Sequence, residues 1–351
     1  MIETQGNRPH PRLSFCIPTY NFGAFIGETL ESIISQASGK VEIVVVDGAS
    51  TDNTNEVVRD FQKRFDPLIY HRREKNMGVD ADLAKAVELA GGDYCWLMSS
   101  DDVLVPGAVA RMISELEHGN DIYLCNRKEC DLQLNPIRKR HWLQKKTGDA
   151  VFELSDRLQL LNYLNNARSL GALFSYISSI VLLRSKWLLV ERDEKLTGTN
   201  YAHVYRLFSF IKYGCSLKYI NDALVLCRRE NDSFQRSGPI KRVAIDLEGY
   251  HMLAEKLFHE ADIRDAFKYV MQRQYRLPML VWLRNCATDL KEWQYLKSRF
   301  LAFGYKKLTL DVVEFLASLP FAGIAIKTML GLRQTARSLR QQLMNPSRHS
   351  Y

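Results

Sequence analysis

Apolar residues in the first 125 positions of this chain follow two alternating spacings. Residues 41–46 (VEIVVV) are β-branched and nearly continuous, which is typical of a strand buried on both faces. Ile26, Leu30 and Ile33 instead recur at the spacing of one helical face. Together the two patterns predict strands near 13–18, 41–46, 67–71, 94–98 and 121–125, with helices near 26–34, 57–65, 79–90 and after 106.

Strands that alternate with helices of this length predict right-handed crossovers and a mostly parallel sheet with helices on both faces. The expected fold class is therefore α/β, with a Rossmann-like arrangement. In such sheets a ligand binds beyond the carboxyl ends of the strands. The loops predicted at this edge are polar and contain Gly, Asn, Asp or Ser; they are residues 18–23, 47–54, 76–80 and 99–103.

The rest of the chain predicts two further parts. Residues 126–170 are polar and basic, and we expect them to leave the strand–helix pattern and to lie near the site. From about residue 240 the sequence is poor in Gly, and helices are predicted near 250–258, 267–283 and 293–303. The expected organisation is one domain over 1–238, with a nucleotide-binding half at 12–125 and an acceptor half at 126–238, followed by a helical region at 239–351 that ends in a basic amphipathic tail.

Composition narrows the cellular setting. The seven cysteines include no Cys-x-x-Cys pair, so we expect reduced core thiols rather than a disulfide framework or a zinc site. The N-terminal residues contain no apolar stretch typical of a signal sequence, which predicts a cytosolic start. The formal net charge is +8, yet no acidic residue follows Glu314 while five Lys and Arg residues do. A basic tail of this kind favours an anionic surface as its partner.

The loop after the fourth predicted strand carries the candidate chemistry. The sequence has neither a GxxxxGK[ST] loop nor a GxGxxG fingerprint, which argues against a P-loop NTPase and a dinucleotide oxidoreductase. It does have Ser99-Ser100-Asp101-Asp102. Two adjacent carboxylates can hold a divalent cation, Mn2+ or Mg2+, that also contacts substrate phosphates and neutralises charge on a departing diphosphate. The alternative is that Asp102 caps the helix predicted near Pro106.

The order and spacing of these loop residues resemble family 2 glycosyltransferases of the GT-A fold. The stretches concerned are 18–21 (PTYN), 46–52 (VDGASTD), Asn76-x-Gly78 and 99–102 (SSDD), and the resemblance covers roughly residues 12–125. It implies transfer of a sugar from a nucleotide-diphosphate donor to a hydroxyl group. The SSDD variant is similar to the abequosyltransferase-like group, which implies a deoxyhexose donor and a polyprenyl-lipid-linked glycan acceptor in bacterial surface polysaccharide (O-antigen-like) synthesis.

The resemblance also implies roles for individual residues. Asp47 would accept a hydrogen bond from the nucleotide base, and Ser50 and Asp52 would shape the same loop. Asp101 would bind the metal and the diphosphate. Ser99 stands at the first position of the family's DxD motif, so metal affinity is low unless Asp102 compensates as a second ligand. The other residues implied to bind the donor are Pro18, Thr19, Tyr20, Asn21, Asn76, Gly78, Asp80, Ser99 and Ser100.

A general base is implied as well, because members of the family are usually inverting and the acceptor hydroxyl must lose a proton. The family places an acidic pair at the start of a helix behind the acceptor site. Residues 198–205 (GTNYAHVY) occupy that stretch, and His203 falls where the Asp would be. An imidazole has a suitable pKa, so His203 is the candidate base, with a structural histidine as the alternative. Asp193 and Glu194 are the other candidates.

A second basic segment, residues 227–233 (CRRENDS), resembles the part of the family that closes over the donor. Guanidinium groups can bind a diphosphate through two hydrogen bonds at once, so Arg228 or Arg229 is predicted to contact it. A surface ion pair is the alternative reading of either residue.

The far C-terminal sequence predicts a peripheral membrane location. Residues 315–326 are uncharged but too few to span a bilayer, and Pro320 interrupts them. Leucines and arginines then lie on opposite faces of a predicted helix, which suits the headgroup region of an anionic membrane. We therefore expect the protein at the inner face of the cell membrane. The alternative is a helix packed on the core with a basic solvent face.

Three other functions fit parts of the sequence. A sugar nucleotidyltransferase would need a basic residue in the loop after the first strand, and residues 18–23 contain none. An inactive relative that only binds a nucleotide sugar would explain Ser99 and the missing acidic base. A nucleic-acid-binding protein would fit the pI of about 9.0, but no helix-turn-helix or RNA-binding motif is present, so no nucleic acid partner is expected.

Overall fold

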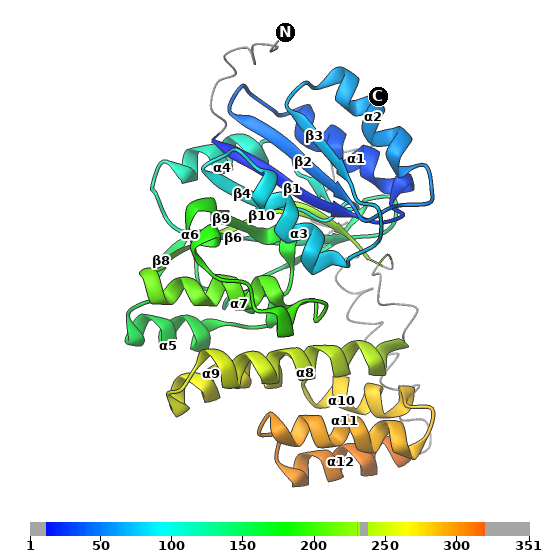
Figure 1. Ribbon diagram of the computed structural model, residues 1–351. Coiled ribbons are helices and arrows are strands. Elements are labelled where there is room, and N and C mark those ends of the chain that lie inside the picture. The colour runs from blue at the N-terminus through cyan, green and yellow to red at the C-terminus, as the bar shows by residue number, and fades with distance from the viewer. Residues whose placement is uncertain (1–11, 230, 232–237, 320–351) are drawn as a thin grey trace, which may run out of the picture. The chain divides into compact units, whose positions relative to one another are not determined.

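The computed structural model describes residues 12–229, 231 and 238–319 (Figure 1). These residues form two compact units. One comprises the described part of 12–231 together with 255–266, and the other comprises 238–254 together with 267–319. The organisation into domains at 1–238 and 239–351 stays a prediction. The tail predicted to bind membranes lies mostly outside the described residues.

The first unit is built on a ten-stranded sheet in the order β3-β2-β1-β4-β9-β6-β10-β5, with β7 paired to β6 and β8 paired to β10 (Figure 1). Its strands are β1 (Leu13–Thr19), β2 (Val41–Asp47), β3 (Leu68–Arg72), β4 (Tyr94–Leu97), β5 (Val103–Leu104), β6 (Ile122–Cys130), β7 (Pro136–Arg140), β8 (Ala150–Glu153), β9 (Ile180–Leu183) and β10 (Ser216–Arg228).

The first four strands run parallel, as predicted. β1 pairs in parallel with both β2 and β4, and β2 pairs in parallel with β3. The register places Thr19 opposite Asp47, and Asp47 opposite Arg72. The carboxyl ends of these strands therefore lie at one edge, where a ligand of an α/β sheet is expected.

Beyond β4 the sheet is mixed rather than parallel. β9 lies between β4 and β6 and is antiparallel to both, whereas β6 and β10 pair in parallel. A strand of four apolar residues such as β9 carries no sequence signal for its direction, because direction is set by pairing with segments far away in the chain.

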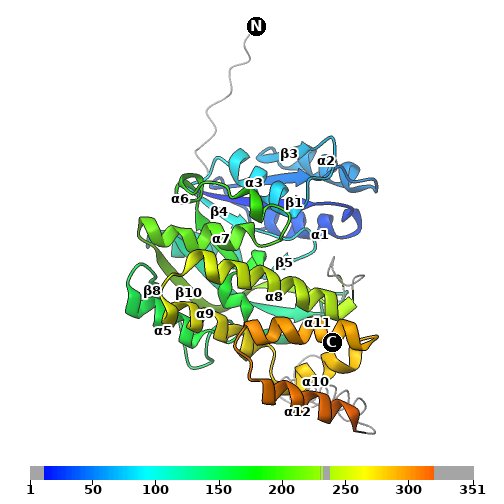
Figure 2. The same cartoon turned by 60° about the horizontal axis from the view of Figure 1, so that its bottom comes forward.

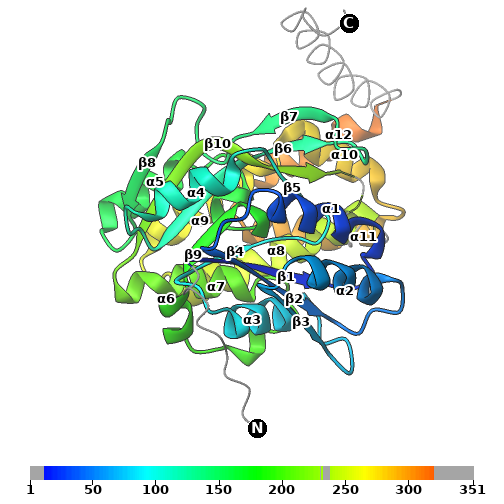
Figure 3. The same ribbon diagram turned by 90° about the horizontal axis from the view of Figure 1, so that it is seen from above.

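Helices cover both faces of this sheet (Figure 3). On one face α1, α2 and α4 share a core with Leu13, Phe15 and Ile17 of β1. On the other face α3 packs against β1 and β2. The predicted α/β class is confirmed. The helices of this unit are α1 (Gly23–Ile34), α2 (Thr54–Arg64), α3 (Val79–Leu89), α4 (Ala108–Leu116), α5 (Arg157–Asn166), α6 (Arg184–Leu189) and α7 (Ala202–Ser209), with short 3-10 turns η1 (Leu170–Leu173), η2 (Ile177–Ser179), η3 (Glu194–Leu196) and η4 (Phe210–Tyr213).

The C-terminal region is helical, as predicted, with α8 (Gly238–Leu257), α9 (Ala261–Gln274), α10 (Leu277–Cys286), α11 (Leu290–Ala302) and α12 (Lys307–Ser318). Within the second unit α10 and α12 lie side by side (Figure 2). The single helix predicted over 267–283 is wrong: α9 ends and α10 begins with Pro278 in its first turn, because proline disfavours the helical conformation of the residue before it.

Two further features bear on the predictions from composition. The seven cysteines are free thiols and six of them are buried, as expected for reduced core residues. Among the helices that the structure describes, none is both long enough and apolar enough to cross a bilayer.

Candidate active site

The loops after β1 and β2 form one hydrogen-bonded surface. The Asn21 backbone N–H donates to Ser50 Oγ (2.8 Å), and the Thr51 backbone N–H donates to Asn21 Oδ1 (2.8 Å). Asn21 has a φ of 58°, a left-handed conformation that asparagine tolerates better than most residues. Beside it the side chain of Tyr20 is 42 % exposed, whereas Pro18 and Thr19 are buried in β1. The predicted donor residues of these two loops therefore lie together at the edge of the sheet.

Asp52 anchors the helices that begin behind these loops. One carboxylate oxygen accepts from the Gly23 backbone N–H (2.9 Å), and the other accepts from the Thr54 backbone N–H (3.0 Å) and hydroxyl (2.5 Å). Burial alone would raise the pKa of Asp52, but the hydrogen bonds from Thr54 and Gly23 outweigh it and lower this pKa. Asp52 thus fixes the start of α1 relative to α2 and shapes the loop from the side.

Asp47 lies beneath the loop, not on its surface. Its side chain is fully buried, and one oxygen accepts from the Ser50 backbone N–H (2.8 Å). The other accepts from the Tyr70 hydroxyl (2.6 Å) and lies 3.6 Å from Arg72 Nε. Burial and this carboxylate raise the pKa of Tyr70 well above its usual range. A nucleotide base that bonded to Asp47 would have to replace one of these partners.

A side chain at Gly48 would have to displace the Asp82 carboxylate. A Cβ atom at this position would lie 2.8 Å from Asp82 Oδ2. Asp82 forms an ion pair with Arg73, whose backbone N–H donates to Asp47 O (2.8 Å). Burial raises the pKa of Asp82 although Arg73 opposes this shift. The start of α3 is therefore held against the loop after β2 (residues 47–54).

This close approach predicts the effect of one methyl group. We expect Gly48→Ala to lower the free energy of unfolding by about 1–3 kcal/mol, the usual cost of overpacking, because the methyl group displaces the Asp82 carboxylate. Urea denaturation measures this. Gly39→Ala is the matched control, since nothing lies within 4 Å of its Cβ position. Equal stability of both variants would contradict this close approach.

Two other residues predicted to bind the donor define the start of α3. Asn76 Oδ1 accepts from the Gly78 backbone N–H (2.8 Å), and Gly78, with a φ of 82°, is the N-cap residue of the helix. Only glycine adopts this backbone conformation without strain. Asn76 and Gly78 therefore set the turn that carries Asp80 toward the edge of the sheet.

Asp101 lies in the loop after β4, with its carboxylate held on both sides. Ser99 Oγ donates to one oxygen (2.5 Å), and Asn231 Nδ2 donates to the other (2.9 Å). Arg228 Nη1 donates to the Asp101 backbone oxygen (2.6 Å). Ser99, which stands where the family has an acidic residue, thus orients Asp101; its neighbour Ser100 is buried.

Asp102 is turned into the protein. The hydroxyls of Tyr176 and Ser178 both donate to its Oδ2 at 2.5 Å, and Ser178 Oγ also accepts from the Ser99 backbone N–H (2.9 Å). Burial and the nearby charge of Asp101 raise the pKa of Asp102 to about 7. The N-cap residue of α4 is Gly107, so Asp102 is not a helix cap. In this arrangement it fastens the loop to the η2 turn.

Arg228 is a buried support of the same loop. Its side chain is 1 % exposed, and each guanidinium nitrogen donates within the protein: Nη1 to Asp101 O, Nη2 to Glu28 (2.6 Å) and Nε to Leu132 O (3.1 Å). It thereby joins α1 and the β6–β7 hairpin to the Asp101 loop. A diphosphate contact by Arg228 would require these bonds to be exchanged. The half-buried Arg229, whose backbone N–H donates to Cys130 O (3.0 Å), remains a predicted diphosphate contact.

The Asp101 loop suits a cation that is shared with a substrate. Across the described residues no three His, Cys, Asp or Glu side chains gather into a metal site. Asp101 and Ser99 offer hard oxygen ligands, and Mg2+ is commonly held by one or two carboxylates and completes its shell with phosphate oxygens and water. The residues present therefore fit an ion bound together with a diphosphate.

Asp80 connects α3 to the segment that carries the candidate base. Its Oδ2 accepts from the backbone N–H groups of Gly198 (3.0 Å) and Asn200 (2.8 Å). Both of these residues have positive φ, 85° and 68°. Asp80 thus fixes the turn that precedes α7 and sets where that helix starts.

His203 lies in the first turn of α7 and is 6 % exposed. Its Nε2 lies 2.8 Å from the Phe174 carbonyl oxygen. A carbonyl only accepts, so Nε2 carries the hydrogen and Nδ1 keeps the lone pair of the neutral ring. Burial lowers the pKa of His203, although the negative charge of Asp80 opposes this. A neutral imidazole at physiological pH with a free lone pair meets the requirement for a general base.

The lowered pKa predicts how stability depends on pH. Below about pH 6.5 the unfolded chain binds a proton at this histidine that the folded chain does not, so the free energy of unfolding falls as pH falls toward the folded-state pKa. We expect His203→Gln to lose less stability on acidification than wild type. Urea denaturation at several pH values measures this, with His259→Gln, at an exposed histidine, as control. Parallel losses in both variants and wild type would contradict the assignment.

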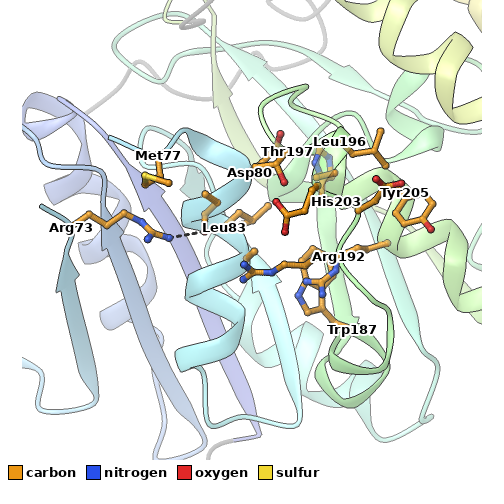
Figure 4. Close-up of a pocket in the computed structure, with 16 residues that line it drawn as sticks. Arg73, Met77, Asp80, Leu83, Trp187, Arg192, Leu196, Thr197, His203 and Tyr205 are labelled. Atoms are coloured by element: carbon orange, nitrogen blue, oxygen red, sulfur yellow. Dashed lines mark hydrogen bonds between the residues drawn. The ribbon is translucent and has the colours of Figure 1, made fainter. Parts of the chain in front are cut away.

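A cavity of about 190 Å³ lies beside His203, between α3 and the segment that leads into α7 (Figure 4). Asp80 and His203 line it, and so do Asp193 and Glu194, the other two candidate bases. Asp193 forms an ion pair with Lys256 and caps η3, whereas Glu194 is exposed. The structure therefore brings all three candidate bases to one cavity.

Several residues of the site were not found from the sequence. Tyr176 and Ser178, which hold Asp102, and Glu28, which pairs with Arg228, belong to no motif. Asn231 lay within the quoted basic segment but had no predicted role. Each acts through a contact with a distant part of the chain, which only the fold reveals.

Much of this site lies in a region of the chain that matches a known protein family. The model of the family "Glycosyl transferase family 2" matches residues 14–188. Abequosyltransferase RfbV of Salmonella typhimurium is 33 % identical over 333 residues, which cover 93 % of this chain and 95 % of that protein. Glycosyltransferase GlyG of Streptococcus pneumoniae is 23 % identical over 245 residues, which cover 67 % of this chain and 74 % of that protein.

Solved structures share the fold. S. aureus TarS in complex with UDP superposes with a TM-score of 0.60 at 16 % identity, covering 97 % of this chain and 93 % of that one. Mannosyltransferase PcManGT from Pyrobaculum calidifontis, in complex with GDP-Man and Mn2+, superposes with a TM-score of 0.53 at 15 % identity, covering 95 % and 87 %. At these identities the likeness shows the fold alone.

Proposed function

Because the chain belongs to glycosyl transferase family 2, and is thus a glycosyltransferase, we propose that it moves a deoxyhexose from a nucleotide-diphosphate donor to a hydroxyl of a lipid-linked glycan. The observation that carries this proposal is the position of Asp101, held in the loop that begins at the same edge of the sheet as the loops after β1 and β2. The likeness to an abequosyltransferase over 93 % of the chain favours a deoxyhexose and an O-antigen-like polysaccharide.

The donor nucleotide would bind over the loops after β1 and β2. The exposed ring of Tyr20 offers a stacking surface for a base, and the Asn21–Ser50 bond keeps the two loops together beneath it. Asp47 holds this loop from below and would meet the base only after one of its present partners is exchanged.

The diphosphate would lie at Asp101. There Asp101, with the hydroxyl of Ser99, would hold Mn2+ or Mg2+, and Asp102 would keep the loop in place through Tyr176 and Ser178. The bound ion supplies one thing to the reaction: it neutralises the charge that develops on the departing diphosphate.

His203 would act as the base. The acceptor oxygen forms a bond to the anomeric carbon while the bond from that carbon to the diphosphate oxygen breaks, and the acceptor proton moves to Nδ1 of His203. Attack from the face opposite the leaving group inverts the anomeric configuration. The buried, neutral state of the ring supports this role, since the lone pair is available without prior loss of a proton.

The acceptor implies a membrane. We place the protein on the cytoplasmic face, held peripherally through the basic residues after Glu314. Binding of the full chain to anionic liposomes should weaken as salt screens these charges. If the full-length protein does not bind such liposomes at low salt, the proposed membrane location is wrong.

The function is tested with a panel of CDP-, dTDP-, UDP- and GDP-linked sugars in a thermal-shift assay with and without Mn2+. A donor present at a hundred times its dissociation constant should stabilise the fold by about 2.7 kcal/mol. The sugar that stabilises the protein is then offered with lipid-linked acceptors, and NMR of the product shows whether the configuration inverts. Failure of every nucleotide sugar to stabilise the protein would contradict the proposal.

A further inference from the structure

The cavity beside His203 has the size of a single ring. Its volume of about 190 Å³ exceeds the roughly 150 Å³ of an engineered protein cavity that holds benzene, so one six-membered ring fits. Its walls come from α3 on one side and from the segment between α6 and α7 on the other (Figure 4). A chain of several sugars would not fit inside.

The lining matches the chemistry of a neutral sugar. Met77, Leu83 and Leu196 give an apolar surface for the C–H face of a ring. Around them stand equal numbers of cationic and acidic side chains, so the cavity has no excess charge of either sign; they are Arg73, Arg192, Arg206, Asp80, Asp193 and Glu194. Charged groups form stronger hydrogen bonds with hydroxyls than neutral groups do. This combination favours an uncharged polyhydroxylated ring over an acidic or an amino sugar.

Two lining side chains carry buried hydrogen-bond donors that lack acceptors among the described residues. Arg206 is only 8 % exposed, and its guanidinium stacks on the Trp187 ring at 4.6 Å. One of its nitrogens donates to Val190 O (2.8 Å), but Nε and Nη1, like Trp187 Nε1, have no partner among the described residues. Buried donors of this kind usually find an acceptor. These three nitrogens are closed off from water in this structure, so a sugar hydroxyl oxygen could accept from them only after the Arg206 or Trp187 side chain moves.

The cavity also adjoins the donor edge. Arg73, on its wall, donates its backbone N–H to Asp47 O at the end of β2 (2.8 Å). On the same wall Asp80 holds the turn before α7, and His203 faces the space from that helix (Figure 4). A ring in the cavity would therefore lie between the loop after β2 (residues 47–54) and His203.

We propose that this cavity binds one neutral hexopyranose unit of the acceptor glycan and presents one of its hydroxyls to Nδ1 of His203. The assignment rests on the proposed function, since it names the acceptor of the same reaction. The donor sugar, which enters attached to the diphosphate at Asp101, is the other source of such a ring.

The test uses saturation-transfer NMR on the full chain, with methyl α-mannopyranoside and methyl α-galactopyranoside as neutral probes and glucuronate and glucosamine as charged ones. Ala84→Phe fills the cavity from α3, and Thr197→Trp fills it from the opposite wall, so that one misfolded variant does not end the test. Ala302→Phe is the matched control, because this alanine is exposed and far along the chain in α11.

We expect the neutral probes to bind wild type and Ala302→Phe, and to bind the filled variants at least about tenfold more weakly, a change of 1.4 kcal/mol. Affinity for the nucleoside diphosphate, measured by calorimetry, should not change. No binding of the neutral probes to wild type, equal binding to the filled variants, or preference for a charged probe would each overturn the proposal.

Competition separates the two sources of the ring. A full nucleotide sugar that displaces the neutral probe, when the nucleoside diphosphate alone does not, would show that the cavity holds the donor sugar and would overturn the acceptor assignment. Absence of any nucleotide binding would instead count against the proposed function itself. The two failures are therefore distinguishable in one set of titrations.

Discussion

Asp101→Asn should lower turnover by about 10²–10³-fold, because the loss of the metal's charge stabilisation is worth several kcal/mol. The fold should remain intact, since an asparagine of the same size can still accept from Ser99 Oγ. Steady-state kinetics and a melting curve on the same preparation measure the two effects. The variant should also respond little to EDTA, whereas wild type should lose activity in EDTA and regain it with Mn2+.

Asp102→Asn is the matched comparison, because the two carboxylates are adjacent and both buried but have different hydrogen-bond partners. Tyr176 and Ser178 both donate to Asp102 Oδ2, so this variant should lose stability, by about 1–3 kcal/mol, more than it loses metal affinity. A metal titration of activity separates the two residues. Full activity of wild type in EDTA would take the metal out of the mechanism, and equal metal affinities of the two variants would make Asp102 a direct ligand.

The predictable part of the fold is the part in which local pattern and tertiary structure agree. The first four predicted strands run parallel with helices between them because each strand is a short run that contains apolar residues and each helix has one apolar stripe. The edge at which a ligand is expected follows from the same rule. The order of the later strands does not, because β9 reaches its place between β4 and β6 through pairings that no local pattern records.

The site shows the same division at the level of single residues. The position of Asp101 at the end of a buried strand could be derived from the sequence alone. The directions of the neighbouring side chains could not be derived in this way. Asp102 turns toward Tyr176, and the guanidinium of Arg228 donates hydrogen bonds to Glu28, Leu132 and Asp101. Charge suggests that a residue binds something, but the fold decides whether the partner is a substrate or the protein.

His203 is the residue for which the two kinds of evidence now meet. The sequence offered it as a replacement for an acidic base, and the structure gives it a hydrogen bond that leaves Nδ1 free and a cavity into which the ring faces. His203→Ala should therefore lower turnover by about 10²–10⁴-fold, the usual contribution of a general base. Donor affinity should barely change, because in the proposed mechanism the diphosphate binds at Asp101 and not at His203.

His203→Gln sharpens this test, because its amide can still donate to Phe174 O while it has no basic nitrogen. A base predicts equal losses of turnover in the alanine and glutamine variants; a structural histidine predicts that glutamine restores stability and activity together. The wild-type rate should also fall on acidification only below the ordinary histidine pKa of about 6.5, since burial lowers the pKa of this ring. Near-wild-type turnover in well-folded His203→Gln would sink the assignment and direct the search to Glu194, the exposed carboxylate of the same cavity.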